Sequence, residues 1–404
     1  MAMLKQTQKI NFQKLFADSF YYLVLTISIV LFLFAINLAV QNFETGRDIQ
    51  VFCRAGVVIS NGQNPYLTSE LELELSWNYP SILAYAFHIP CTFFNFEQNY
   101  ILPYILFFVI SLLFWLQKQN WFYGIALCAT GLFNLGWVMI TGNLSTIEFL
   151  LFSLSAFLLF RNKINASVFL FGLMASMKLI PILYLPAFLF LQNDMKKKIT
   201  TISWAMIGFL SLPLLSLISS PHLFPFYLRQ LFGLIPNQHN PLNEFTPIVL
   251  NQSLSVMILS FLGLESQLEK LNLIFSLVIY ALGIFALYII FKTLSKSGQP
   301  ENKLILFSFG IIILTIFMPR LKPYSFLPAL LCFYLISREQ SALFKSIYLI
   351  LLSIVPTVLH LIYFYTQTSE KIFIFHQISF LCLATIVLVF STMKKHKPLQ
   401  EKMK

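Results

Sequence analysis

The sequence predicts an all-α polytopic membrane protein. Of its 404 residues, 58% are hydrophobic, only 11% are charged, and 44 are phenylalanine. So few charged residues cannot cover the surface of a soluble globule of this size. The net charge of +11 does not indicate a nucleic-acid partner, because the basic residues stand in short clusters between apolar runs. Such clusters are typical of topology signals at the ends of membrane spans.

The apolar runs predict the spans. A helix needs about 20 residues to cross about 30 Å of hydrocarbon. On this criterion we expect about twelve crossings, over residues 20–40, 99–117, 121–139, 143–160, 164–177, 180–192, 199–219, 270–292, 303–318, 324–337, 341–364 and 371–392. The first run has no small-residue cleavage site after it, so we expect a retained anchor. The pieces 164–177 and 180–192 are short and are predicted to form a hairpin with Lys178 at its tip.

Positive charge predicts the orientation. If residues 80–96 form a short helix or re-entrant segment on the outer side, most of the 27 lysines and arginines lie in the cytoplasm. Both termini are then cytoplasmic, in a cell inner membrane, and loop 41–98 lies on the outer face. If residues 80–96 crossed the membrane instead, Lys196, Lys197 and Lys198 would lie outside, which is disfavoured.

Asp48 is the candidate catalytic residue. It begins a short helical pattern that ends at the turn signal Asn61-Gly62. Transfer of a lipid-linked sugar needs a carboxylate to take the acceptor's proton and cations to hold the departing phosphate. Arg47 and Arg54 share one polar helical face, and the opposite apolar face fits either the membrane or the helix bundle. A solvated loop aspartate is the simpler alternative.

Lys178, Arg320 and Lys322 are the candidate phosphate-binding cations. A lysine at a hairpin tip in the membrane needs an anionic partner, such as a lipid phosphate, unless it snorkels to the interface. Arg320 and Lys322 form a basic corner that fits lipid headgroups or a bound phosphate. Buried in the span after Asn143, Glu148 is expected to be either paired or functional.

The remaining candidate substrate contacts are polar residues of the same outer face: Tyr79, Asn143, Asn251 and Gln252. Amide side chains can bind sugar hydroxyls, although they also cap helices. The five cysteines show neither CxxC pairs nor histidines at zinc spacing. We therefore expect no metal site and no disulfide framework, although Cys53 and Cys91 could share a compartment.

Short motifs occur in a fixed order along residues 20–260: Gly46-Arg47-Asp48-Ile49-Gln50-Val51-Phe52, Asn61-Gly62-x-Asn64-Pro65-Tyr66, Tyr79-Pro80, Gly142-Asn143, Gly172-Leu173, Met177-Lys178-Leu179-Ile180-Pro181 and Asn251-Gln252-Ser253-Leu254. In this order they resemble glycosyltransferase family 87 of the GT-C superfamily. The resemblance implies a GT-C-type fold with an outer juxtamembrane helix loop after the first span. It divides the chain into a catalytic module, residues 1–260, and carboxy-terminal helices, residues 261–404.

The resemblance also implies an activity. It is the inverting transfer of a hexose, with mannose favoured, from a polyprenyl-phosphate donor to a lipid or glycan acceptor on the non-cytoplasmic side. Asp48 then matches the catalytic acidic position and Lys178 the basic position of the hairpin. Besides membrane lipids and these substrates no cofactor is implied, and a divalent metal is left open. The alternative is a transporter or flippase of lipid-linked saccharides, which the lack of inverted repeats disfavours.

Overall fold

The computed structural model describes residues 2–42, 45–73, 75–116, 120–192, 194–232, 234–235, 253–264, 268–294, 301–366 and 376–401, and every element in these ranges is a helix. In chain order the helices are α1 (Ala2–Asn42), α2 (Arg47–Ser60), α3 (Thr68–Leu71), α4 (Ser81–Phe94), α5 (Phe96–Asn99), α6 (Ile101–Leu113), α7 (Trp121–Thr130), η1 (Gly131–Phe133), α8 (Asn134–Thr141), α9 (Ser145–Phe160), α10 (Ile164–Met177), η2 (Ile180–Tyr184), α11 (Leu185–Phe190), α12 (Met195–Ser219), α13 (Phe224–Leu231), α14 (Leu254–Phe261), α15 (Leu268–Leu294), α16 (Glu301–Ile316), α17 (Leu327–Ser337), α18 (Ala342–Leu349), η6 (Ile350–Ile354), α19 (Val355–Thr366) and α21 (His376–Glu401).

Within the described ranges, five helical stretches are long and apolar enough to cross a membrane: Lys14–Asn42, Trp121–Thr141, Met195–Ser219, Ile274–Lys292 and Ala342–Thr366. The other apolar helices are 10–17 residues long. Each predicted span overlaps a helix, so the all-α membrane class is confirmed. The number of crossings stays a prediction, because helices this short do not by themselves span about 30 Å of hydrocarbon.

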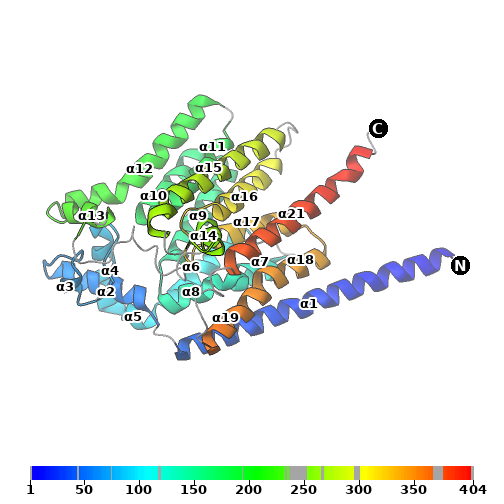
Figure 1. Ribbon diagram of the computed structural model, residues 1–404, viewed down its shortest axis with the longest axis horizontal. Coiled ribbons are helices and arrows are strands. Elements are labelled where there is room, and N and C mark those ends of the chain that lie inside the picture. The colour runs from blue at the N-terminus through cyan, green and yellow to red at the C-terminus, as the bar shows by residue number, and fades with distance from the viewer. Residues whose placement is uncertain are drawn as a thin grey trace.

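The two chain ends leave the bundle at the same end, at the free ends of α1 and α21, while α2 to α5 and α13 lie at the opposite end (Figure 1). Helices from both halves of the sequence pack together, since α1 contacts α18 and α19, and α17 contacts α7 and α9. One large hydrophobic core cluster accordingly runs from Val24 to Leu388. The division of the chain at residue 260 stays a prediction.

α10 and α12 cross at two glycines. A Cβ on Gly172 would lie 2.1 Å from the carbonyl oxygen of Ala205, and a Cβ on Gly208 would lie 2.2 Å from that of Phe169. Only glycine lets the two backbones approach this closely, as is common between membrane helices. α10 then ends at Met177, and Lys178 adopts an extended conformation before η2. The crossing thereby fixes the position of the Lys178 turn.

α2 packs its apolar face against α4 inside the protein. Ile49 and Phe52 are buried, and the Phe52 ring stacks on Phe87 with centroids 5.0 Å apart. The sequence left open whether this apolar face lies against the membrane or against the helix bundle, and the structure shows that it packs inside the bundle. α4 also confirms that a short helix follows Pro80, while its side of the membrane stays a prediction.

A disulfide joins Cys53 of α2 to Cys91 of α4. The sequence indicated no disulfide framework but left the pairing of these two cysteines open as the less favoured outcome, and this pairing is the one observed. Spacing rules detect cysteines that are close in sequence or arranged in dense frameworks. These two are 38 residues apart on separate helices, and only the packing of α2 on α4 brings them together.

Candidate active site

Asp48 is held in the first turn of α2 by contacts with the end of α8. Gly46 precedes the helix in the left-handed conformation, and its N–H donates to the carbonyl of Ile140 at 2.7 Å. Gly142 also has a positive φ of 71°, and a Cβ there would lie 2.9 Å from Cβ of Ile49. Glycine at position 142 therefore allows the start of α2 to lie directly on the turn that precedes α9.

Asn143 bridges the two residues singled out in the sequence. Its Nδ2 donates to Oδ2 of Asp48 at 2.7 Å, and its Oδ1 accepts from Nζ of Lys178 at 3.2 Å. The same Oδ1 accepts from the backbone N–H of Ser145 at 3.2 Å and from its hydroxyl at 2.7 Å. An ammonium and a backbone N–H can only donate, so these partners fix which way the buried amide points. Asn143 thus couples a carboxylate to a cation.

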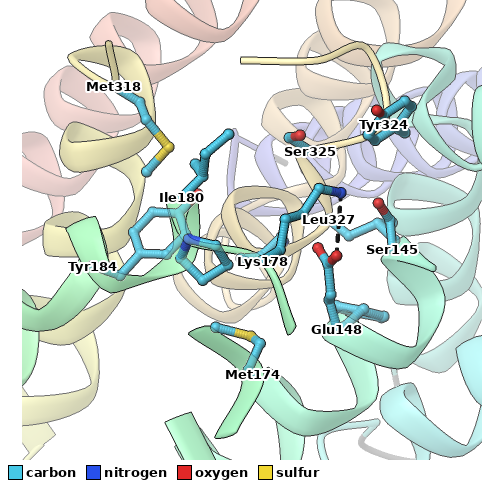
Figure 2. A pocket seen from close by; sticks show the side chains of 13 residues that line it. Ser145, Glu148, Met174, Lys178, Ile180, Tyr184, Met318, Tyr324, Ser325 and Leu327 are labelled. Carbon is cyan, nitrogen blue, oxygen red and sulfur yellow. Dashed lines mark ion pairs between the residues drawn. The ribbon is translucent and has the colours of Figure 1, made fainter. Parts of the chain in front are cut away.

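Lys178 has a carboxylate partner from its own chain. Its Nζ lies 3.1 Å from Oε1 of Glu148, and 17% and 14% of the two side chains are exposed. The ammonium also lies over the Tyr324 ring, 4.8 Å from the centroid. Figure 2 shows the Lys178 amine between Glu148 and Tyr324. The anionic partner that Lys178 was expected to need is therefore Glu148, and the expectation that Glu148 is paired is confirmed.

A small cavity of about 30 Å³ adjoins this ion pair. Its lining comprises Ser145, Glu148, Phe149, Met174, Lys178, Ile180, Pro181, Tyr184, Met318, Tyr324, Ser325, Leu327 and Pro328. Ser145, Glu148, Tyr324 and Ser325 lie on one side of the view and Met174, Ile180, Tyr184 and Met318 on the other (Figure 2). The cavity holds about one water-sized molecule, with polar groups on one wall and apolar groups facing them.

Tyr79 lies close enough to Asp48 and Glu148 to sense their charges. Its ring packs against those of Phe52 and Trp77, with centroids 5.3 and 5.1 Å away, and its carbonyl accepts from the hydroxyl of Tyr66 at 2.9 Å. Burial raises the pKa of Tyr79 well above 10, and the nearby charges of Asp48 and Glu148 add to the shift. The phenol is therefore protonated at neutral pH and can donate a hydrogen bond but cannot act as a base.

α2 also carries Arg47 and Arg54, the two arginines that were predicted to contact substrate. Arg54 forms an ion pair with Glu72, and its Nε donates to the carbonyl of Leu71 at 3.0 Å. It lines a separate surface cavity of about 460 Å³, together with Gln50 and the disulfide. Arg47 is exposed in the first turn of α2.

Arg320 and Lys322 lie in the turn between α16 and α17, and Lys322 is buried. This turn contributes Tyr324 to the site, two residues after Lys322. In the sequence, Arg320 and Lys322 identify this turn as a candidate site, whereas no local pattern distinguishes Tyr324 from other tyrosines. Asn251 and Gln252 lie outside the described residues. Within the described ranges, no three histidine, cysteine or acidic side chains are grouped as metal ligands.

A family model described as glycosyltransferase family 87 matches residues 77–319. The matched stretch contains Tyr79, Asn143, Glu148 and Lys178, begins after Asp48, and continues beyond residue 260, where the motifs seen in the sequence end. Neither a curated protein nor a solved structure matches the chain.

Proposed function

Because the chain belongs to glycosyltransferase family 87 and is therefore a membrane glycosyltransferase, we propose that Asp48 is its general base and Lys178 its donor-phosphate cation. The observation that carries the proposal is the chain of hydrogen bonds from Asp48 through Asn143 to Lys178. It holds a proton acceptor and a cation at a fixed separation. The proposed donor is a hexose, with mannose favoured, on a polyprenyl phosphate, and the acceptor is a lipid or glycan hydroxyl.

In the proposed reaction, Asp48 takes the proton of the acceptor hydroxyl as its oxygen bonds to the anomeric carbon. The bond from that carbon to the phosphate oxygen breaks, and the electron pair leaves with polyprenyl phosphate. The ammonium of Lys178 stabilises the charge that develops on the phosphate. Attack opposite the leaving group inverts the configuration of the anomeric carbon. Asn143 holds the carboxylate in position through the hydrogen bond from Nδ2.

The site is proposed to lie on the non-cytoplasmic face of the membrane. The Cys53–Cys91 disulfide in the α2–α4 unit supports this, because disulfides persist in oxidising compartments. Both chain ends lie at the opposite end of the bundle (Figure 1). They would then be cytoplasmic, which agrees with the lysines near both termini.

The other polar residues keep proposed roles in substrate binding. The phenol of Tyr79 is a hydrogen-bond donor beside Asp48, and Arg47 is exposed one residue before Asp48, so both are proposed to contact substrate hydroxyls. Arg320 and Lys322 are proposed to contact the donor's headgroup from the α16–α17 turn. Asn251 and Gln252 are proposed sugar contacts on the basis of their residue type alone. Arg54 would contact substrate only after leaving Glu72.

The proposal is tested with purified protein in detergent, polyprenyl phosphate carrying radiolabelled mannose, and an extract of lipid acceptors. A transferase moves the label from the phosphate to an acceptor in the absence of a sealed membrane. A transporter or flippase leaves the sugar–phosphate bond intact under these conditions. The same donor carrying labelled glucose is the matched control for sugar identity, and equal transfer of both sugars would contradict the preference for mannose.

A further inference from the structure

The carbonyl group of Gly142 accepts a hydrogen bond from the side chain of Tyr104. Tyr104 lies in α6 and is fully buried, and its hydroxyl donates to that carbonyl oxygen at 2.9 Å. Gly142 directly follows α8, at the end of a helix where carbonyl groups have no partner within the helix. The phenol of Tyr104 supplies the donor that the helix itself cannot.

This hydrogen bond holds the peptide unit that leads into Asn143. A peptide group is planar, so the carbonyl of Gly142 and the N–H of Asn143 turn together. A rotation of this peptide unit would move the Asn143 side chain, whose amide donates to Asp48 and accepts from Lys178. The hydroxyl of Tyr104 is thus one residue away from the link between the candidate base and the candidate cation.

The ring of Tyr104 is held independently of its hydroxyl. Its centroid lies 5.5 Å from that of Tyr100 and 6.1 Å from that of Phe96, both in edge-to-face contacts. Tyr104→Phe therefore keeps the packing and removes only the donor. Gly142 is buried, and a buried carbonyl that loses its partner carries a free-energy cost. Rotation of the Gly142–Asn143 peptide unit towards another donor would reduce that cost.

Tyr100 makes a matched contact one helical turn earlier. The N–H of Tyr104 donates to the carbonyl of Tyr100 at 3.1 Å, and the Tyr100 hydroxyl donates to the carbonyl of Met139 at 2.6 Å. Met139 lies inside α8, four residues before Asn143, where the helix itself restrains the peptide units. The two tyrosines therefore offer the same chemistry to the same segment, but only Tyr104 holds the peptide unit of Asn143.

We propose that Tyr104 is a positioning residue of the active site, whose hydroxyl holds the Gly142–Asn143 peptide unit so that Asn143 keeps Asp48 in place for proton transfer. This rests on the proposed function, in which Asp48 is the base. Tyr104 acts through Asn143 and touches no substrate.

The test measures kcat for sugar transfer, from a saturating radiolabelled polyprenyl-phosphate donor, by the wild type, Tyr104→Phe, Asn143→Ala and the double variant. We expect Tyr104→Phe to lower kcat by about 2- to 12-fold, the range that corresponds to the net contribution of one neutral hydrogen bond. In the Asn143→Ala background the same substitution should leave kcat unchanged, because the residue through which Tyr104 acts is then absent. A tyrosine with only a structural role would lower kcat by the same factor in both backgrounds.

The pH profile, with Tyr100→Phe as the matched control, gives a second readout. Tyr104→Phe should move the acid limb of the kcat profile to higher pH, because a displaced Asn143 stabilises the ionised form of Asp48 less well. Tyr100→Phe loses a comparable hydrogen bond and should leave the acid limb in place. An equal loss of kcat in both backgrounds, or an equal movement of the acid limb in both tyrosine variants, would overturn the proposed role of Tyr104.

A further measurement keeps the hydroxyl of Tyr104 and so does not depend on how well Tyr104→Phe folds. The ¹⁹F NMR signal of 3-fluorotyrosine at position 104 should differ between an otherwise wild-type chain and Asn143→Ala. The reason is that the peptide unit held by the Tyr104 hydroxyl relaxes when the side-chain hydrogen bonds of Asn143 are lost. An unchanged signal would contradict the coupling of Tyr104 to Asn143.

Two variants separate this proposal from the proposed function. If Asp48→Asn transfers sugar like the wild type, or if Asn143→Ala keeps the wild-type kcat and acid limb, the proposed positioning of a catalytic Asp48 fails, and the role of Tyr104 fails with it. If both variants lose activity while Tyr104→Phe keeps the wild-type kcat, only the role of Tyr104 fails.

Discussion

Replacing Asn143 by alanine removes the link between Asp48 and Lys178. The hydrogen bond from Nδ2 to the Asp48 carboxylate is 2.7 Å long, and a second one joins Oδ1 to the ammonium of Lys178 at 3.2 Å. A hydrogen bond to a charged group contributes about 1.5–3 kcal/mol net. If that energy positions the base in the transition state, Asn143→Ala lowers kcat by about 10- to 150-fold.

The pH dependence gives a more specific signature. The hydrogen bond from Asn143 favours the ionised form of Asp48, so without it the carboxylate takes up its proton at higher pH. The acid limb of the kcat profile should then move to higher pH. The assay is transfer of radiolabelled sugar from a polyprenyl-phosphate donor at saturating concentration, across pH.

Gln230→Ala is the matched control. Gln230 is also a buried amide, and its Nε2 donates to the side chains of Ser76 and Asn78, each at 2.7 Å. We expect this variant to lose stability while its acid limb stays in place. Asn143→Ala with wild-type kcat and an unmoved acid limb would refute the coupling of Asp48 to Lys178.

Three further predictions concern the outer unit that positions Asp48. The Cys53–Cys91 bridge closes a loop of 38 residues, which stabilises the fold by about 4 kcal/mol through loop entropy. A reductant should therefore lower the thermal midpoint of the wild type and leave that of the double variant Cys53→Ser/Cys91→Ser unchanged. Equal responses of the two proteins would contradict the stabilising role of the bridge. Gly142→Ala should lose more stability and activity than Gly62→Ala. Both glycines have a positive φ, but only a Cβ at position 142 would press against Ile49. Equal losses in the two variants would show that the close approach of residue 142 to Ile49 is unimportant. Because burial raises the pKa of Tyr79 well above 10, its neutral phenol stabilises the fold fully below about pH 10 and progressively less above it. The thermal midpoint should therefore fall more steeply above about pH 10 in the wild type than in Tyr79→Phe.

Features that depend on one stretch of chain were predictable from the sequence. Each apolar run became a helix, since hydropathy and length decide this locally. Asp48 and Lys178 could be singled out because a charge next to an apolar run is costly unless it has a use or a partner. The short helix after Pro80 was predictable because a full crossing there would have placed the lysine-rich loops of the later spans outside the cell.

Features that depend on packing were not predictable. Asn143 meets Asp48 across 95 residues and Lys178 across 35, and no periodicity relates positions so far apart. The pairing of Glu148 with Lys178 needs α9 and α10 to lie side by side, which the connection at residues 161–163 permits but does not specify. Tyr324 reaches the site because the turn between α16 and α17 lines the same cavity as η2. In the sequence, the basic residues of this turn are more conspicuous than its tyrosine.

Asp48 is proposed to be the base of a transferase whose donor is held by Lys178. This role is tested most directly by sugar transfer with Asp48→Asn, a near-isosteric change that keeps a side-chain oxygen able to accept from Asn143. We expect this variant to fold and to bind the polyprenyl-phosphate donor like the wild type, yet to transfer no detectable label. Transfer at the wild-type rate by Asp48→Asn would contradict the proposed role of Asp48.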